Sequence, residues 1–500
     1  MSKKIMFQGT GSSVGKSLIV AAVCRILNNH GYHVAPFKSQ NMSLNSFITE
    51  EGKEMGRAQV VQAEAARIKP MVAMNPILLK PTSDVGSQVI LNGEVFQNME
   101  AMTYFSSKDY LIPHIEKAFQ TLSDKFDIIV IEGAGSPAEI NLRSRDVVNM
   151  GLAEIVDTDV LLIGDVDKGG VFASLYGTFL LLSDVEQARI KGFVINKFRG
   201  DVELLMPGVK MLEDLIHRPC YGVIPFINDL KIDDEDSVTE RFNNKSNRRI
   251  KIGVIKLPYM SNFTDFTVFD LESDVSLEYL TSGSDLQTCD LIVIPGSKNT
   301  IHDMRYLIES GMNHAIYKAH RNQIPIVGIC GGYQILGQTI EDTHGVESIE
   351  NKINGLGLLE VKTQMAQDKT TRQATGKVVT SFFDLPIIDL DLSGYEIHMG
   401  VTTFMNENVK PFMMTDLGAH DGALSDSGDV MGTYYHGIFD NDNFRHALLN
   451  RLRRDKGFFE SYESVSFETL KDNEYNRLAA HVEAYLDIAG ILKLLEQSRC

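Results

Sequence analysis

The chain has 500 residues, enough for about three domains or for two large ones with an extension, and 43% of them are hydrophobic, which suffices for sizeable cores. The formal net charge of −18 argues against a general nucleic-acid binder, because binding to phosphates needs clustered Lys and Arg. The five cysteines are scattered without C-x-x-C spacing, which excludes a disulfide framework and a paired-cysteine zinc or redox site. There is no signal-peptide pattern and no run of about 20 apolar residues, so we expect a cytoplasmic protein without a membrane span.

The first half of the chain alternates short apolar runs with amphipathic segments. Residues 17–31 are apolar at helical spacing and end at Gly31, which is typical of a helix with a C-terminal stop. Short apolar runs between such helices predict a parallel sheet that is covered on both faces. The strands predicted for this sheet are 3–8, 33–39, 127–133, 159–166, 192–198 and 221–225.

A second α/β series follows a charged stretch. Residues 233–250 carry few apolar side chains, and this composition predicts a linker. We therefore predict two doubly wound α/β domains, at residues 1–232 and 251–445, and a helical C-terminal extension at 446–500. The strands predicted in the second series are 251–258, 289–297, 324–330, 356–365, 376–383 and 394–404.

A candidate phosphate-binding loop, FQGTGSSVGKS, lies between the first predicted strand and the first predicted helix. The backbone N–H groups of such a loop bind an anion, Lys16 would reach the terminal phosphates of a nucleotide, and Ser17 would ligate Mg²⁺. A tight Gly-rich connection is the alternative, but the GKS triplet in this context favours phosphate binding. Five residues separate Gly9 from Gly15, where the usual loop has four. The nucleotide-binding residues predicted here are Thr10, Gly11, Gly15, Lys16 and Ser17.

Polar residues end three other strands of the same predicted sheet. Glu132 ends one strand, Asp165 and Asp167 lie at the end of the next, and Asn196 ends a third, where it is a candidate for base recognition. Because ligands bind at the carboxyl ends of strands in an open α/β sheet, these positions favour phosphoryl chemistry over solvated strand ends. The sequence thus predicts ATP binding, with Ser17 and Glu132 holding the metal.

The second domain carries a cysteine at a sharp turn. In IVGICGGYQILG, Cys330 lies between an apolar strand and a helix, which is typical of a nucleophile held at the tip of a turn. The alternative is a buried packing cysteine. His436, in TYYHGIF, is a candidate general base, and backbone donors for an oxyanion are expected near Gly296 and Ser297 in VIPGSKNT. Three such elements on an α/β background favour catalysis over packing.

Both halves resemble known families. The longer-spaced loop around Lys16 is similar to that of dethiobiotin synthetase, whereas the signature lysine of partitioning ATPases would fall at Gly11. The second domain resembles the class I (triad) glutamine amidotransferases, which hydrolyse glutamine through a cysteine thioester. That family usually has a glutamate two positions after the histidine, where this chain has Ile438, and Glu396 in GYEIHMG is the candidate we name to orient His436. The resemblance implies oxyanion or glutamine-binding roles for Gly296, Ser297, Gly331, Gln334 and Glu396.

Residues 1 to about 495 together resemble the cobyric acid synthase family, most specifically at 37–46, 74–93, 131–142, 165–178 and 394–400. The resemblance implies ATP- and glutamine-dependent amidation of the b, d, e and g carboxylates of adenosylcobyrinic acid a,c-diamide, with Mg²⁺ as cofactor and no nucleic-acid or membrane partner. A homo-oligomer is compatible with it. Polar residues suited to a corrinoid substrate that carries carboxylates and amides are Lys38, Gln40, Asn41 and Lys80.

Two alternatives stay open at this point. The sibling family, cobyrinic acid a,c-diamide synthase, would add two amides rather than four. A protein of another class, a non-catalytic scaffold switched by a nucleotide, would keep both folds without using Cys330.

Overall fold

The computed structural model describes residues 2–81, 86–100, 108–232, 248–348, 350–461 and 466–497. They form two compact units: unit 1 draws on residues 1–43, 54–235 and 471–500, and unit 2 on 44–53 and 236–470. The chain thus changes unit after residues 43, 53, 235 and 470, whereas the sequence predicts a single linker at 233–250, most of which lies outside the described residues. Among the described residues, no helix combines the length and apolar composition needed to cross a membrane.

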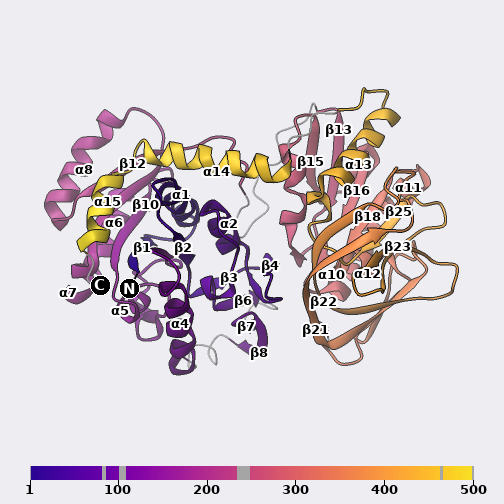
Figure 1. The fold of residues 1–500 in the computed structure, drawn as a ribbon, viewed down its shortest axis with the longest axis horizontal. Coiled ribbons are helices and arrows are strands. Elements are labelled where there is room, and N and C mark those ends of the chain that lie inside the picture. Colours follow the sequence, from indigo (N-terminus) through magenta and orange to yellow (C-terminus); the bar gives the residue numbers. More distant parts are fainter. Residues whose placement is uncertain are drawn as a thin grey trace. The chain divides into compact units, whose positions relative to one another are not determined.

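The main sheet of unit 1 is parallel, with the order β12-β11-β10-β1-β9-β2 (Figure 1). Ile5 and Phe7 of β1 belong to one hydrophobic core, and Met6 between them is buried as well, so both faces of the sheet are covered. This confirms the predicted α/β fold class. The strands are β1 (Lys3–Gly9), β2 (Val34–Phe37), β9 (Ile128–Glu132), β10 (Asp159–Asp165), β11 (Ile190–Phe198) and β12 (Cys220–Pro225).

Helices surround this sheet, and the helices at the C-terminal end of the chain pack into its hydrophobic core. Leu478, Val482 and Ile491 lie in the same core as β1, although they come from the end of the chain, drawn in yellow in Figure 1. The buried guanidinium of Arg25 donates to Asp472 at 2.6 Å, which fixes this end on the first helix. The helices of unit 1 are α1 (Lys16–Asn29), α2 (Arg57–Ala65), α4 (Lys108–Ser123), α5 (Met150–Ile155), α6 (Val171–Leu180), α7 (Asp184–Arg189), α8 (Val202–Ile216), α15 (Ile488–Gln497) and, from Lys471 on, α14 (Phe467–Glu483).

A second, smaller sheet of unit 1 has the order β3-β6-β7-β8. Its first two strands are parallel and the others are antiparallel. It contains three of the residues that the sequence predicts for substrate binding: Gln40 and Asn41 on β3, and Lys80 on the adjacent β6. The strands are β3 (Gln40–Met42), β6 (Ile77–Pro81), β7 (Gly86–Leu91) and β8 (Glu94–Glu100).

The sheet of unit 2 has a parallel and an antiparallel part. The parallel part has the order β15-β13-β16-β18-β25 and agrees with the predicted fold class. The antiparallel part continues from β25 and includes two long strands, β21 and β22, so the predicted doubly wound pattern does not extend over 361–424. The strands are β13 (Ile250–Ile255), β15 (Val275–Leu280), β16 (Leu291–Ile294), β18 (Ile326–Ile329), β19 (Thr339–Glu341), β20 (Lys352–Asn354), β21 (Val361–Val378), β22 (Asp391–Phe404), β23 (Lys410–Thr415), β24 (His420–Leu424) and β25 (Val430–Thr433).

Several helices and two short strands of unit 2 carry the polar residues described below. They include the single-turn segments η4 and η6, which follow the short strand β14 and the strand β25, respectively. The segments used below are β14 (Met260–Ser261), η4 (Phe263–Phe266), α9 (Val268–Leu271), β17 (Gly296–Ser297), α10 (Thr300–Glu309), α11 (Met312–Arg321), α12 (Gly331–Leu336), η6 (Ile438–Asp440) and α13 (Asp442–Asp455).

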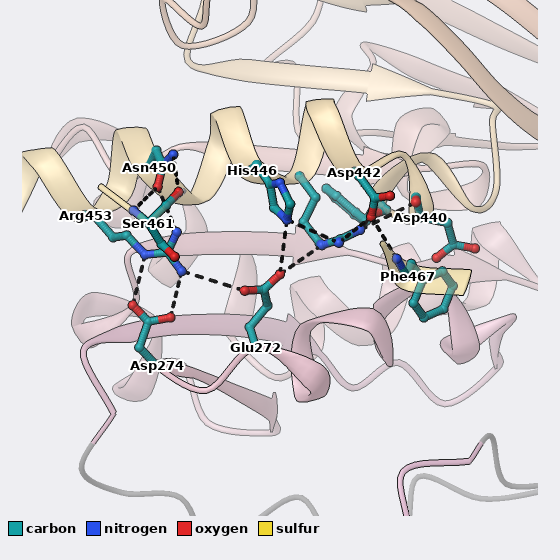
Figure 2. Close-up of polar contacts among 11 residues, drawn as sticks. Glu272, Asp274, Asp440, Asp442, His446, Asn450, Arg453, Ser461 and Phe467 are labelled. Carbon is teal, nitrogen blue, oxygen red and sulfur yellow. Dashed lines mark hydrogen bonds and ion pairs between the residues drawn. The ribbon is translucent and has the colours of Figure 1, made fainter. Parts of the chain in front are cut away.

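Charged side chains fix α13 to the residues that follow α9. Figure 2 shows Arg453 and His446 of α13 directed toward Glu272 and Asp274, and Arg453 donates to both oxygens of Asp274 at 2.9 and 2.7 Å. The fully buried Arg445 donates to Glu272 at 3.0 Å and to the carbonyl of Phe439 at 3.0 Å. Such paired, hydrogen-bonded buried charges hold two segments in a defined position.

Candidate functional site

Cys330 lies in a strained turn between β18 and α12. Its backbone has φ 52° and ψ −106°, a conformation that costs a non-glycine residue about 1–3 kcal/mol and that clusters at functional sites. Its N–H donates to the Thr433 carbonyl at 2.8 Å. Gly332 makes the tight turn possible, because a Cβ there would lie 2.0 Å from the backbone oxygen of Ile294. The turn therefore holds the thiol in one place, as the sequence predicts.

His436 follows β25 and meets Cys330. The side chain of Cys330 is close enough to raise the pKa of His436, its Sγ donates to the Ile397 carbonyl at 3.6 Å, and the histidine is almost fully buried. Its backbone exchanges hydrogen bonds with Tyr395 at 2.9 and 3.2 Å, and the two rings are stacked with centroids 5.2 Å apart. The structure thus brings together the two predicted catalytic residues.

A carboxylate that the sequence does not reveal lies on the other side of His436. Asp265 of η4 has its Oδ2 2.6 Å from Nδ1 of His436, and its Oδ1 accepts from the N–H of Gly437 at 3.1 Å. Burial lowers the pKa of His436, but the charge and hydrogen bond of Asp265, together with Cys330, outweigh burial and raise that pKa to about 10. The histidine therefore lies between a carboxylate and a thiol in a water-poor setting.

The sequence predicts that Glu396 orients His436, but the structure gives this carboxylate another partner, Arg372. Both of its carboxylate oxygens accept from Arg372, at 2.8 and 3.1 Å, in a bidentate ion pair on neighbouring strands. A fork of this kind satisfies the carboxylate geometry by itself. Glu396 thus supports β21 and β22 near the site and has Arg372 as its partner instead of the histidine.

The predicted oxyanion loop adjoins the cysteine turn. A Cβ on Gly331 would lie 2.7 Å from the backbone nitrogen of Ser297, and a Cβ on Gly296 would lie 3.2 Å from Cε1 of His436. The hydroxyl of Ser297 is directed away, since it donates to the buried Asp303 at 2.5 Å. The backbone N–H groups of this loop, and not the hydroxyl, are therefore the donors at hand for an oxyanion.

Gln334, predicted to contact glutamine, forms hydrogen bonds with two other segments of unit 2. Its Oε1 accepts from the Thr300 hydroxyl at 3.0 Å, and its Nε2 donates to the Tyr434 hydroxyl at 3.2 Å. The Tyr434 ring in turn stacks on the His398 ring, with the two ring centroids 3.8 Å apart. Both polar atoms of Gln334 are thus hydrogen-bonded within the unit, which connects α12 to α10 and to the residue after β25.

In the phosphate-loop candidate of unit 1, the lysine is hydrogen-bonded to backbone carbonyls. Lys16 donates to the carbonyls of Gly11 and Gly135 at 2.9 and 3.1 Å. Gly15, at φ 93°, has no room for a side chain, because a Cβ would lie 2.3 Å from Nδ2 of Asn196. That amide donates to the carbonyl of Val14 at 2.9 Å, so Asn196 holds the loop. Thr10 begins the loop, and its N–H donates to the Ile163 carbonyl at 2.9 Å.

The predicted metal-binding pair is also in contact. The Ser17 hydroxyl donates to Oε1 of the buried Glu132 at 2.9 Å, and Lys38 donates to the same oxygen at 3.0 Å. Gln62 donates to the other oxygen, Oε2, at 2.5 Å. A hydroxyl and a carboxylate beside a phosphate loop fit Mg²⁺, which prefers oxygen ligands and takes only one or two from the protein. Among the described residues, no cluster of three or more His, Cys, Asp or Glu forms an all-protein metal cage.

The residues predicted for the corrinoid are mostly buried. Lys80 pairs with the buried Glu54 at 2.8 Å, as Lys38 pairs with Glu132. Asn41 is buried and its Oδ1 accepts from the N–H of Met42 at 3.0 Å, while Gln40 is half-buried. The structure thus places Lys38 in the phosphate site, and the other three on the small sheet of unit 1.

Two family models match the chain. A CobQ/CobB/MinD/ParA nucleotide binding domain matches residues 5–239, and a CobB/CobQ-like glutamine amidotransferase domain matches residues 251–444. The matched stretches contain the Lys16 loop and the Cys330–His436 pair, respectively.

Curated proteins that match the chain are similar over nearly its whole length. Cobyric acid synthase of Clostridium acetobutylicum is 52% identical over 494 residues, covering 98% of both chains. Cobyric acid synthase of Clostridium botulinum is 52% identical over 498 residues, covering 98% of this chain and 99% of the relative, and that of Thermoanaerobacter sp. is 48% identical over 506 residues, covering 99% of both. With two matching domain models and this degree of identity from end to end, the chain belongs to the cobyric acid synthase family.

Proposed function

We propose that this chain makes adenosylcobyric acid by amidating the b, d, e and g side-chain carboxylates of adenosylcobyrinic acid a,c-diamide with ammonia from glutamine, at the expense of ATP. The observation that carries the proposal is that this single chain contains two sites. One is the Cys330–His436 pair, and the other is a phosphate-loop candidate in which the Ser17 hydroxyl donates to Glu132. The first pair supports release of ammonia, and the second supports activation of its acceptor.

Cys330 and His436 account for glutamine hydrolysis. The proton of the thiol passes to His436, the sulfur attacks the amide carbon of glutamine, and the histidine returns the proton to the departing ammonia. Water then hydrolyses the thioester to glutamate, with His436 again as base. The negative oxygen formed in each attack needs donors, and the backbone N–H groups near Ser297 and Gly331 are proposed to supply them; their proximity supports this assignment.

The loop around Lys16 accounts for activation of the carboxylate. A carboxylate is a poor acyl donor, because its charge repels nucleophiles and hydroxide is a poor leaving group. Attack of its oxygen on the γ-phosphorus of ATP gives an acyl phosphate and ADP, and attack of ammonia on the acyl carbon then gives the amide, inorganic phosphate and a proton. Lys16 and the loop N–H groups would hold the triphosphate.

Ser17 and Glu132 are the residues that would hold Mg²⁺, and Asn196 is proposed to position the base of the nucleotide. When bound, the ion neutralises charge on the β- and γ-phosphates. Lys38, which donates to Glu132, is proposed as the cation that attracts the acceptor carboxylate. Gln40, Asn41 and Lys80 are proposed to recognise the amides and carboxylates of the corrinoid.

Further parts of the proposal concern the chain as a whole. The limits 1–232 and 251–445 for the two catalytic regions are supported by the family matches at 5–239 and 251–444. The helices after residue 446 are proposed as an extension that completes the fold without contributing to the chemistry. A homo-oligomer and a cytoplasmic location are in keeping with this proposal, the latter because a free catalytic thiol needs reducing surroundings.

The product of the purified protein tests the function. With glutamine, ATP, Mg²⁺ and adenosylcobyrinic acid a,c-diamide, mass spectrometry should show four successive amidations. Conversion of cobyrinic acid to its diamide, with no further amidation, would instead identify the sibling activity. Ammonia release from glutamine should disappear in Cys330→Ala, and equal release from this variant and the parent would support the non-catalytic scaffold.

A further inference from the structure

We propose that Asp265 is the positioning residue of the glutaminase site: it orients His436 for proton transfer with Cys330, from a segment 171 residues earlier in the chain. The inference rests on the proposed hydrolysis of glutamine at Cys330. It assigns to a residue of η4 the task that a glutamate two positions after the histidine usually has, where this chain carries the apolar Ile438.

The hydrogen bonds of Asp265 determine which nitrogen of His436 serves as the base. A carboxylate only accepts, so Nδ1, at 2.6 Å from Oδ2, carries the proton of that contact. The other ring nitrogen, Nε2, is then the one that exchanges a proton with the thiol of Cys330. The second oxygen, Oδ1, accepts from the N–H of Gly437 at 3.1 Å, so the carboxylate is held against both the ring and the backbone of the histidine segment.

The carboxylate also stabilises the charged histidine that forms during the reaction. When the Cys330 proton moves to Nε2, the ring becomes a cation, and the negative charge of Asp265 lies against it in a buried site. In the described part of the chain, the other titratable groups that face the ring include Cys330, Tyr395, whose ring stacks on it, and the neutral His398, whose pKa burial lowers to about 4. Asp265 is therefore the acidic side chain that offsets this charge.

The backbone that carries Asp265 is fixed on both sides. At its start, the side-chain oxygens of Asn45 and Asn262 accept from the N–H groups of Phe263 and Ser46, each at 3.1 Å. Further on, the rings of Phe266 and Phe269 contact Phe439 of η6, with centroids 6.3 and 4.9 Å apart. The segment with the carboxylate and the segment after the histidine are thus packed against each other.

Beyond α9 the same two segments are joined a second time. Figure 2 shows the ion pairs between α13, which follows His436 in the chain, and Glu272 and Asp274, which follow Asp265. On the far side of the ring, Tyr395 stacks on His436. The ring is therefore confined by packing, and the hydrogen bond to Asp265 selects its orientation and tautomer.

The test is the full-length Asp265→Asn variant, compared with Asp270→Asn as a matched control. Asp270 is a buried acid of the neighbouring α9 whose N–H donates to Thr267, and it is outside the site. We expect the kcat for glutamine hydrolysis to fall about 10²- to 10⁴-fold in Asp265→Asn, as for an amide in place of a triad carboxylate, with KM little changed. Amidation driven by ammonium salts should keep the parent rate, and Asp270→Asn should match the parent in both assays.

A second readout separates positioning from folding. The rate of alkylation of Cys330 by iodoacetamide, followed by peptide mass spectrometry, reports its thiolate at each pH. In the parent, the charge of Asp265 stabilises the histidine cation that forms when the Cys330 proton moves to Nε2, and this favours the reactive thiolate. Loss of the Asp265 charge removes a cause that raises the pKa of His436, so alkylation of Cys330 in the variant should be slower at neutral pH and should need a higher pH than in the parent.

Three results would overturn the assignment: an unchanged kcat in Asp265→Asn, an unchanged alkylation profile, or the same loss of kcat in Asp270→Asn. A large loss of kcat in Glu396→Gln with none in Asp265→Asn would transfer the role to Glu396. These outcomes differ from failure of the proposed function, in which the parent itself releases no ammonia or Cys330→Ala releases as much as the parent.

Discussion

The side-chain oxygen of Asn45 accepts a hydrogen bond of 3.1 Å from the backbone N–H of Phe263, 218 residues later in the chain. Asn45 lies in a segment, residues 44–53, that is part of unit 2 although both of its flanks belong to unit 1. The turn that carries Asp265 thus depends on residues from the N-terminal half of the sequence.

Replacing Asn45 should therefore weaken glutamine hydrolysis. Asn45→Ala leaves the buried N–H of Phe263 without its acceptor, a loss of about 1–3 kcal/mol. We expect a lower kcat for ammonia release, measured by a coupled glutamate assay, together with a reduced Tm. Asn45→Asp keeps an acceptor oxygen and should retain more activity than Asn45→Ala; equal effects of the two changes would show that this hydrogen bond is dispensable.

Single substitutions should abolish one half-reaction, glutamine hydrolysis or carboxylate activation, and leave the other intact. Cys330→Ala should lose glutamine-dependent amidation and regain activity with ammonium salts, because unit 1 still activates the carboxylate. Lys16→Ala should fail with either nitrogen source but still hydrolyse glutamine. The measurement is amide formation by mass spectrometry beside ammonia release. Rescue of Lys16→Ala by ammonium would place the activation site elsewhere.

A single methyl group at the cysteine turn should abolish hydrolysis. In Gly332→Ala the new Cβ would lie 2.0 Å from the backbone oxygen of Ile294, so the turn must open and Cys330 must move. We expect loss of ammonia release and a reduced Tm. In contrast, Gly177→Ala in α6 meets no atom within 4 Å, and it should stabilise the chain by up to about 1 kcal/mol. Full activity in Gly332→Ala would contradict the strained turn.

The ion pair between Arg453 and Asp274 should make stability depend on acid pH. The hydrogen bond from Arg453 holds the pKa of Asp274 below its usual value, so the folded state favours the ionised carboxylate. The stabilisation is full above the unfolded pKa of Asp274, about 3.9, and is lost as the pH falls through the lower folded pKa. Arg453→Met should therefore cost about 2 kcal/mol at neutral pH and progressively less below about pH 4.

Calorimetry of parent and variant between pH 7 and pH 3 measures this difference in Tm. Arg454→Met is a suitable control, since Arg454 is half-exposed and pairs with Glu460 at the surface, where such pairs contribute little. A constant difference between Arg453→Met and the parent at every pH would mean that packing of the arginine, and not its charge, stabilises α13.

Those parts of the molecule that the sequence predicts well are local in the chain. The Lys16 loop, the Cys330 turn and the parallel strands each follow from a short run of residues with a strand before it and a helix after it. In β21, side chains also alternate between buried and exposed, but a run that alternates in this way does not reveal its partner. The sequence therefore indicates strands at 356–365, 376–383 and 394–404 but does not indicate that they pair in an antiparallel way.

The residue beside His436 could not be predicted for a similar reason. Asp265, in the run NFTDF, has no motif around it, and the contact with His436 forms only when η4 folds against η6. The sequence favours Glu396 for this role, because GYEIHMG is distinctive and lies closer to His436 in the chain. Its partner proved to be Arg372, on the adjacent strand, which no spacing rule indicates.

The way the chain changes unit also limits how this enzyme can be dissected. A fragment that starts at the linker would lack residues 44–53, and with them the amide oxygen on which the turn before Asp265 rests. It would keep α15, whose apolar face would then have no core to cover. The ammonia-producing half is thus interleaved with its neighbour, and a single proteolytic or genetic cut would leave two incomplete pieces in place of two working modules.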